Sequence, residues 1–302
     1  MIVIGSRGSD LALWQAHFFQ DELTRLGEES RIEVIKTQGD KIQNLTFDKL
    51  EGKGFFTKEL EDALLGGEID IAVHSLKDLP TDPVPGLTLG GLSHRADPRD
   101  TLLINPNSQY KTAKDFVTGS PVIGTSSARR KAQLGRLFPD CKCVDIRGNV
   151  PTRITKLESE NLDGIILAQA GLDRLELDIE RYQPFRFDVM EMVPAPGQGV
   201  LGYQTQTSNI EMRSILRKLH HPDVGACTNI ERGVLNALDG GCQLPLGVHL
   251  YQDKAKNFIS QTSFFDGNEL HQFNHTQSTF DGLKELIIQE LTSKTTVTTK
   301  TL

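Results

Sequence analysis

Residues 121–130 read Pro121-Val122-Ile123-Gly124-Thr125-Ser126-Ser127-Ala128-Arg129-Arg130. The apolar beginning of this stretch predicts a buried strand, and its end predicts the first turn of a helix that continues to Phe138. The small polar residues between them are typical of a short loop and a helix N-cap. A buried strand that leads directly into a helix is the repeating unit of an α/β sheet.

The same alternation runs through the first two hundred residues. Further strands are predicted at 2–4, 31–37, 69–73, 142–146 and 163–167, and helices at about 9–26, 57–65 and 149–159. This rhythm predicts mostly parallel sheets. Two stretches rich in proline and glycine, 81–100 and 194–199, are predicted to be irregular and to flank the second set of elements. We therefore expect two α/β lobes joined by a double hinge, with the chain returning to the first lobe near residue 200.

The last third has a different pattern. Helices are predicted at 209–219, 226–238 and 280–291, and strands at 244–251, 257–264 and 270–274. This predicts a small α+β domain, followed by a tail that is disordered from about residue 293. The expected domains are domain 1 at 1–97 with 199–217, domain 2 at 98–198, and domain 3 at 218–302.

Composition restricts the classes of function. The chain has 302 residues, 37% hydrophobic and 24% charged, with a net charge of −7, so it is not expected to bind nucleic acid or an anionic membrane. We see neither a signal peptide nor a membrane span and expect a cytoplasmic protein with reduced thiols. The Cys141-Lys142-Cys143 spacing matches no compact zinc pattern, and neighbouring strand residues point to opposite faces, so no metal site is expected.

Two loops suggest an anion site. Gly5-Ser6-Arg7-Gly8-Ser9 follows a strand and opens a helix, as 124–130 does. Such loops offer free backbone N–H groups at the positive end of a helix, and arginine adds a planar fork that matches a carboxylate or phosphate. If only one such loop were present, the simplest interpretation would be an ordinary helix N-cap with a solvated arginine. Two loops in equivalent places favour an anion site shared by the two lobes.

Other charged residues fall at strand ends. Arg147, Arg153 and Arg174 follow predicted strands, and ligands of open α/β sheets bind at the carboxyl ends of strands. Singly, each is more typical of a surface charge. Lys77 and Asp78 follow the strand 69–73, where a carboxylate among cations can stabilise a developing positive charge or move a proton. A structural Lys-Asp pair in a turn before proline remains the alternative.

Cys242 lies in the open run Gly240-Gly241-Cys242-Gln243. The glycines favour a tight, sterically open loop, which suits a reactive or modified thiol. Cysteine is also among the residue types most often buried and inert, so the loop alone leaves both interpretations open.

Seven runs together resemble the porphobilinogen deaminases (hydroxymethylbilane synthases). They are Arg7-x-Ser9-x-Leu11-Ala12-x-x-Gln15, Gly52-Lys53-Gly54-x-Phe56-x-Lys58-Glu59-Leu60, Val73-His74-Ser75-x-Lys77-Asp78-x-Pro80, Gly124-Thr125-Ser126-Ser127-x-Arg129-Arg130, Arg147-Gly148-Asn149-Val150-x-Thr152-Arg153, Gly197-Gln198-Gly199 and Gly240-Gly241-Cys242-Gln243-x-Pro245-x-Gly247. The runs follow the order of the family from residue 7 to residue 247.

The resemblance implies a cytoplasmic, monomeric transferase of porphyrin and heme biosynthesis, with two lobes like those of type II periplasmic binding proteins and a small third domain. It implies that Cys242 carries a dipyrromethane cofactor through a thioether. On this primer the family condenses four porphobilinogen molecules head to tail, losing ammonia, and then releases hydroxymethylbilane by hydrolysis. The product passes to uroporphyrinogen III synthesis.

The resemblance also implies roles for single residues. Asp78 stabilises the cation left by ammonia loss and assists proton transfer beside Lys77, and Phe56 covers the site as part of a lid. The implied carboxylate-binding set is Arg7, Ser9, Lys53, Thr125, Ser127, Arg129, Arg130, Arg147, Arg153, Arg174 and Gln198.

The chain departs from the family pattern at Asp10, Pro151, 203–206 and 230–233, which puts stability and rate in question rather than reaction type. Two other classes of function are alternatives. The first is a solute-binding or effector-sensing protein of the same fold. This alternative leaves Cys242 and Asp78 without a role, and it predicts a secretion signal or a DNA-binding segment, which we do not see. A cysteine-dependent hydrolase lacks a motif that brings a base to the thiol.

Overall fold

The computed structural model describes residues 1–37, 57–239 and 243–295. The predictions for Lys53, Phe56 and Cys242 lie outside the described residues. The chain forms two compact units, one of Met1–Ala96 with Gly199–Gly225 (unit 1) and one of Asp97–Gln198 with Ala226–Leu302 (unit 2). The finer division into three domains stays a prediction. No helix within the described ranges is long and apolar enough to cross a membrane.

The described part of unit 1 is built on a five-stranded sheet of order β2-β1-β3-β10-β4. Strands β1, β2 and β3 are parallel, and β10 runs antiparallel between β3 and β4. The strands are β1 (Ile2–Ser6), β2 (Ser30–Val34), β3 (Ile71–Ser75), β4 (Leu87–Leu92) and β10 (Leu201–Gln206). The helices are α1 (Asp10–Arg25), α3 (Lys58–Leu65), the 3₁₀ turn η2 (Leu76–Asp78) and α8 (Ile210–Leu219).

Local sequence explains where α1 begins and how it packs. The Ser9 side chain caps the helix by accepting from the Ala12 N–H, and Asp10 occupies the first turn, where a negative charge suits the helix dipole. Phe19 and Leu23 on the buried face are fully covered and join the core of unit 1. The departure from the family pattern at Asp10 therefore falls at a position where it does not disturb the helix.

The expectation that 81–100 is irregular throughout is wrong, because β4 lies inside it and pairs with β10. The strand was not predicted because its glycines are typical of a loop. A Cβ atom on Gly90 would lie 2.5 Å from Leu216 Cδ1, and one on Gly91 would lie 2.8 Å from the Leu216 carbonyl oxygen. Helix α8 therefore packs so closely on β4 that only glycine fits, although glycine is otherwise unfavourable in strands.

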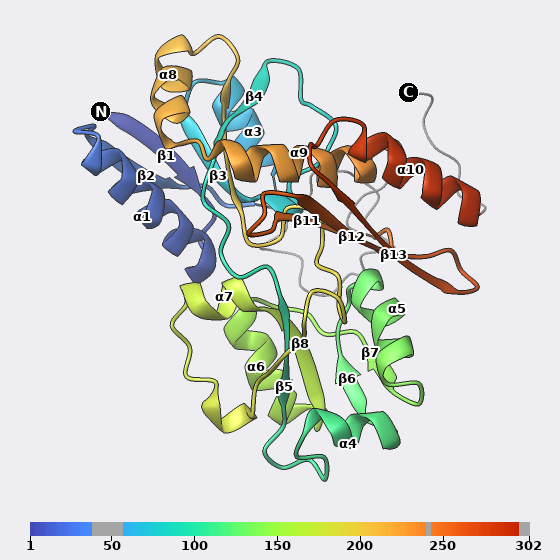
Figure 1. Ribbon diagram of the computed structural model, residues 1–302. Helices are drawn as coiled ribbons and strands as arrows, with labels where there is room; N and C mark the ends of the chain where they lie inside the picture. Colours follow the sequence, from blue (N-terminus) through green and yellow to red (C-terminus); the bar gives the residue numbers. More distant parts are fainter. Residues whose placement is uncertain (38–56, 240–242, 296–302) are drawn as a thin grey trace. The chain divides into compact units, whose positions relative to one another are not determined.

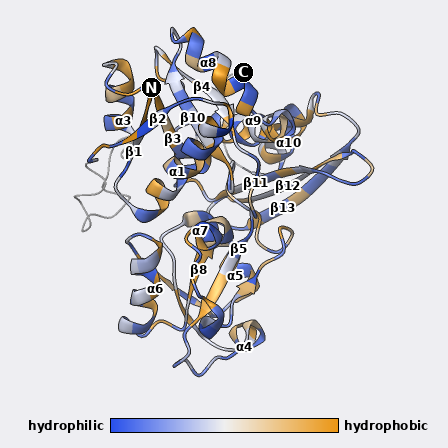
Figure 2. Ribbon diagram, turned by 90° about the vertical axis from the view of Figure 1, so that its left-hand side faces the viewer, coloured by the Kyte–Doolittle hydropathy of each residue, from blue (hydrophilic) through white to orange (hydrophobic). Residues whose placement is uncertain are grey.

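The described part of unit 2 contains a second five-stranded sheet, of order β7-β6-β8-β5-β9. Again three parallel strands are followed by an antiparallel one, here β5. The strands are β5 (Asp100–Ile104), β6 (Val122–Gly124), β7 (Lys142–Val144), β8 (Gly164–Ala168) and β9 (Phe185–Arg186). The helices are α4 (Ala113–Thr118), α5 (Ala128–Leu137), α6 (Val150–Ser159), α7 (Gln169–Arg174) and the 3₁₀ turn η3 (Glu180–Tyr182). Figure 2 shows the hydrophobic residues along β5 and β8.

The rest of unit 2 is a three-stranded antiparallel sheet of β11 (Leu246–Gln252), β12 (Phe258–Phe265) and β13 (Leu270–Gln277), with the long helices α9 (Pro222–Ala237) and α10 (Leu283–Lys294) (Figure 1). Buried residues of both helices and of β11 and β12 form one apolar core. Two α/β sheets and this small α+β part confirm the expected fold class. Helix α10 continues past the predicted start of the tail at 293.

A buried carboxylate connects α9 to two other segments of unit 2. Glu231 is completely covered, and its two oxygens accept from the backbone N–H groups of Gly197 and Leu250, each at 2.7 Å. Both N–H groups would lose this partner if the carboxylate were removed. Buried donors without partners are costly, so Glu231 stabilises the segment before Gln198 together with the start of the small sheet.

We expect Glu231→Ala to lower the free energy of unfolding by about 2–4 kcal/mol, because it leaves two buried N–H groups without an acceptor. Denaturant unfolding followed by circular dichroism measures this. Glu269→Ala is the matched control, since the side chain of Glu269 is 75% exposed. Equal stability of the two variants would contradict the role given to Glu231.

Candidate functional site

In unit 1 the predicted residues meet at the carboxyl ends of two neighbouring parallel strands. Strand β1 ends at Ser6 and leads to Arg7 and Ser9, while β3 ends at Ser75 and leads to Lys77 and Asp78. This edge of a parallel sheet is where α/β proteins bind ligands.

The turn η2 fixes the position of Asp78. Leu76 is fully buried, and its N–H donates to the Val200 carbonyl at 2.9 Å. The next two residues are more exposed to solvent: Lys77 is half-buried and Asp78 is exposed. An apolar anchor thus holds the backbone while the Asp78 carboxylate faces solvent, where it is available to accept hydrogen bonds from a ligand.

A buried polar chain lies beneath this edge. The Gln15 amide on α1 donates to Ser75 Oγ at 2.8 Å, and the His74 ring contacts Gln204 Oε1 at 3.0 Å. Burial lowers the pKa of His74 to about 4; the hydrogen bond to Gln204 opposes this, and the charge of Arg7 lowers the pKa further. His74 is therefore neutral at pH 7. It is a packed, hydrogen-bonded histidine in a buried strand.

In unit 2 a buried acid that the sequence analysis did not single out organises two of the predicted arginines. Asp100, at the start of β5, is completely covered, and its oxygens lie 2.7 Å from Arg129 Nη2 and 2.8 Å from Arg130 Nη2. Burial raises the pKa of Asp100, but the charges of Arg129 and Arg130 outweigh it and hold that pKa well below its usual range. The acid is ionised at neutral pH.

Each member of this network has further partners. Arg129 Nη1 donates to the Val193 carbonyl at 2.7 Å, and Arg130 Nη1 donates to the Ile166 carbonyl at 2.8 Å. The Gln198 amide donates to Asp100 Oδ1 at 3.0 Å and to the Pro98 carbonyl at 2.7 Å. Within the described residues the buried Nε of Arg130 has no hydrogen-bond partner, so this cluster offers a donor to a ligand.

A second basic group surrounds the start of α6. Asn149 caps the helix by accepting from the Thr152 N–H at 2.9 Å, and Arg153 Nε donates to the Gly148 carbonyl at 2.8 Å. Gly148 has a φ of 117°, which disfavours any other residue. Pro151 lies in the first helical turn, where proline is tolerated, so this departure from the family pattern leaves the helix intact.

The remaining predicted residues of unit 2 also lie at strand ends or helix ends. Thr125 follows β6 and is almost fully buried, and Ser127 caps α5 by accepting from the Arg130 N–H. Arg174 ends α7 and is 9% exposed. Arg147 is half-buried in the segment between β7 and α6.

The predicted residues are divided between the two units, and ion pairs and a hydrogen bond join Arg129, Arg130 and Gln198 to one another through Asp100. In unit 1 the predicted residues are Arg7, Ser9, Lys77 and Asp78, and in unit 2 they are Thr125, Ser127, Arg129, Arg130, Arg147, Arg153, Arg174 and Gln198. That the two sets serve one ligand stays the prediction made from the sequence. The sequence analysis missed Asp100 because it lies at the end of a stretch that was predicted to be irregular. The feature that could have indicated it is an acidic residue directly before the strand-like run 101–104.

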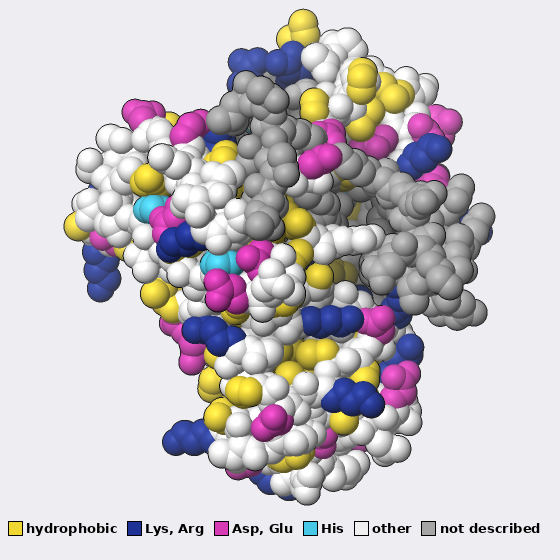
Figure 3. Space-filling model, turned by 90° about the vertical axis from the view of Figure 1, so that its right-hand side faces the viewer, with side chains coloured by type: hydrophobic (Ala, Val, Ile, Leu, Met, Phe, Trp, Pro, Cys, Tyr) yellow, Lys and Arg dark blue, Asp and Glu magenta, His cyan; other side chains and the backbone are white. Residues whose placement is uncertain are grey.

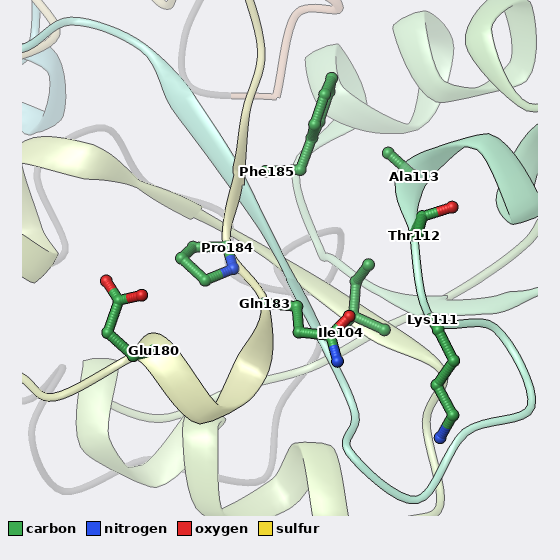
Figure 4. A pocket seen from close by; sticks show the side chains of 8 residues that line it. All are labelled: Ile104, Lys111, Thr112, Ala113, Glu180, Gln183, Pro184 and Phe185. Carbon is green, nitrogen blue, oxygen red and sulfur yellow. The ribbon is translucent and has the colours of Figure 1, made fainter.

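A surface pocket of unit 2 lies at the opposite end of its sheet. Ile104, Lys111, Glu180, Gln183 and Phe185 are among its lining residues (Figure 4). The antiparallel register pairs Ile104 with the first residue of β8, whereas Asp100 pairs with the last, so the pocket is separated from the arginine cluster by the length of the strands. On the face shown in Figure 3, basic and acidic side chains are interspersed.

We expect Asp100→Asn to lower the free energy of unfolding by about 3–5 kcal/mol, because two buried guanidinium groups lose their counter-charge. Chemical denaturation at pH 7 measures this loss. Asp97→Asn is the control, since Asp97 pairs with a partly exposed Arg99 and removal of such a pair costs about 1 kcal/mol or less. Equal losses in both variants would show that Arg129 and Arg130 do not depend on Asp100.

The depressed pKa of His74 predicts a pH dependence of stability. Between pH 6.5 and 4 the unfolded chain binds a proton at this residue and the folded protein does not, so acidification favours unfolding. The contribution is complete above pH 6.5 and amounts to about 3 kcal/mol lost by pH 4, at about 1.4 kcal/mol per pH unit. His74→Gln should flatten this part of the profile of unfolding free energy against pH. Parallel profiles for the two proteins would contradict the prediction.

Comparison with known proteins gives a consistent family. Residues 2–214 match the family model described as "Porphobilinogen deaminase, dipyromethane cofactor binding domain". The chain is 45% identical over 249 residues to the porphobilinogen deaminase of Helicobacter acinonychis, covering 82% of this chain and 79% of that one. It is 41% identical over 269 residues to the porphobilinogen deaminase of Chloroherpeton thalassium, covering 88% and 84%.

Among solved structures, the chain is similar to the second substrate-binding domain of a putative amino acid ABC transporter from Streptococcus pneumoniae. That match has a TM-score of 0.44 at 11% identity and covers 72% of this chain and 91% of that one. A double mutant of the BvgS VFT2 domain from Bordetella pertussis matches with a TM-score of 0.41 at 15% identity, over 72% and 84%.

With seven motifs in order, a family model that spans residues 2–214 and relatives at 41–45% identity over most of their length, the chain belongs to the porphobilinogen deaminase family.

Proposed function

We propose that this protein joins four porphobilinogen molecules head to tail on a covalently bound dipyrromethane, with loss of ammonia, and releases hydroxymethylbilane by hydrolysis. Family membership carries the proposal, because the matched region is the cofactor-binding domain of these enzymes. The gathering of arginine, hydroxyl and helix-N-terminal donors in unit 2 supports it. Porphobilinogen bears an acetate and a propionate, so the growing chain is a polyanion that needs such donors.

The donor set of unit 2 fits the dipyrromethane. This group carries the carboxylates of two porphobilinogen units, and we assign their binding to Thr125, Ser127, Arg130, Arg147 and Arg153. The buried Arg130 Nε, which has no protein acceptor among the described residues, is the observation that favours a bound carboxylate. When attached to Cys242, the dipyrromethane supplies the pyrrole carbon to which the first substrate is joined. Arg129, Arg174 and Gln198 complete and support the set.

In unit 1 we assign the catalytic role to Asp78. An exposed carboxylate at the end of β3 accepts hydrogen bonds from pyrrole N–H groups and stabilises the positive charge that develops as ammonia leaves. It also takes and returns a proton at its carboxylate oxygen. Lys77 stands beside it, and Arg7 and Ser9 at the neighbouring strand end bind substrate carboxylates. Lys53 is a further donor and Phe56 a cover that excludes water.

The proposal extends to the setting of the reaction. The expected enzyme is monomeric and cytoplasmic, and its unstable linear product must be consumed by an enzyme that forms uroporphyrinogen III. Three domains, with Cys242 in a loop that enters the third, are part of the same proposal.

The test compares the wild-type protein with Cys242→Ser and Asp78→Asn by intact-protein mass spectrometry and by turnover of porphobilinogen. The wild type should carry an added mass of two porphobilinogen units less two ammonia molecules, and Cys242→Ser should lack it. Asp78→Asn should keep the added mass and lose turnover by at least about 100-fold, because the substitution removes the charge that stabilises the transition state.

Asp21→Asn is the matched control for Asp78, since this exposed residue lies about three turns along α1 from the cap residue Ser9. An unmodified wild-type chain that also stays unmodified with porphobilinogen would favour a solute-binding protein instead. Full turnover by Asp78→Asn would remove that residue from the reaction and leave the tether in place.

A further inference from the structure

Two cysteines of unit 2 lie next to each other outside the site described above. Cys141 directly precedes β7 and Cys143 lies within it, and their Sγ atoms are 4.0 Å apart. The expectation that these side chains point to opposite faces is wrong. Residues two apart in a strand share a face, and only the intervening Lys142 points away.

The shared face is turned toward α5. Both cysteines pack against the apolar cluster that contains Leu134, Leu137 and Phe138 at the end of this helix. Each of the two remains partly exposed, whereas Cys227 in α9 is buried. The pair is therefore held on a fixed support and stays accessible to a small molecule in solution.

The contact between the two thiols shifts their pKa values in opposite directions. A hydrogen bond from Cys143 lowers the pKa of Cys141, although burial opposes this, and the same contact raises the pKa of Cys143. Lys131 Nζ is held 2.7 Å from the carboxylate of Asp145, the next residue of this face, and its positive charge acts on Cys143. No third ligating side chain in the described part of the chain completes a metal site here.

We propose that Cys141 and Cys143 form a reactive dithiol that exchanges with a low-molecular-weight disulfide such as glutathione disulfide and closes into an intramolecular disulfide. The Cys141 thiolate attacks one sulfur of the small disulfide, forming a mixed disulfide and releasing one thiolate. Cys143 then loses its proton and attacks Cys141 Sγ, which expels the second small thiolate. The protein dithiol is oxidised by two electrons, and one small disulfide is reduced to two thiols.

The short distance between the two sulfur atoms favours the second step, closure of the intramolecular disulfide, over other reactions of the mixed disulfide. The two sulfur atoms lie 4.0 Å apart, and bond formation brings them to about 2.05 Å. A mixed disulfide on Cys141 therefore forms beside a nucleophile that is already in place. Neither cysteine has a role in the proposed function, so the test of this dithiol is independent of the test of that function.

The sequence offers a direct readout, because trypsin cleaves after Lys142 between the two cysteines. The full-length protein, incubated with glutathione disulfide at pH 7.5 (about one unit below the pKa of a free thiol) and alkylated under non-reducing conditions, is digested and analysed by mass spectrometry. We expect peptides 137–142 and 143–147 to appear as a linked pair that dithiothreitol separates.

Cys141→Ser and Cys143→Ser are the matched variants. Cys143→Ser cannot close the ring and should accumulate glutathione on Cys141, whereas Cys141→Ser should react at least about tenfold more slowly than Cys143→Ser. In all three proteins the peptide of Cys227 should be alkylated only after denaturation. Peptides 137–142 and 143–147 recovered separately, with both cysteines free or each carrying its own glutathione, would overturn the proposal.

Discussion

The buried carboxylate of Asp100 is the constraint on which the arrangement of unit 2 depends. It joins the start of β5 to the first turn of α5 and to the Gln198 amide, three segments that lie far apart in the sequence. A buried charge is tolerated only when its partners are complete, so these segments take their places together. Two guanidinium groups face one carboxylate, which leaves an excess positive charge.

Both units use the same local arrangement where a strand leads into a helix. A strand ends, a short polar loop follows, and a side chain caps the next helix: Ser9 for α1, Ser127 for α5 and Asn149 for α6. Each cap satisfies one of the backbone N–H groups in the first turn of its helix. In unit 1 the edge at the end of β3 also presents an exposed carboxylate, Asp78, whereas the carboxylate of Asp100 in unit 2 is completely buried.

The sequence predicted most elements of both sheets because apolar runs and N-caps are local signals. It did not predict β4, since the close approach of α8 requires glycines that resemble a loop. It placed the arginines at strand ends but not their pairing with Asp100, because a contact between residues about thirty positions apart depends on which strands become neighbours. The neighbouring thiols were misjudged for a simpler reason: the two-residue period of a strand places Cys141 and Cys143 on one face.

The departures from the family pattern have physical explanations that spare the chemistry. Gln204 in β10 is an uncharged partner for a buried, neutral His74, where an ionised side chain would add a desolvation cost. Where the family pattern at 230–233 is Ala-Glu-Arg-Ala, this chain has the larger Ile230, which belongs to the core between α9 and the small sheet, and Gly233, where a Cβ would lie 2.8 Å from Lys284 Cδ. One position gains volume and the other loses it. Between them Glu231 accepts hydrogen bonds from its two backbone partners, so both departures lie beside an intact buried carboxylate.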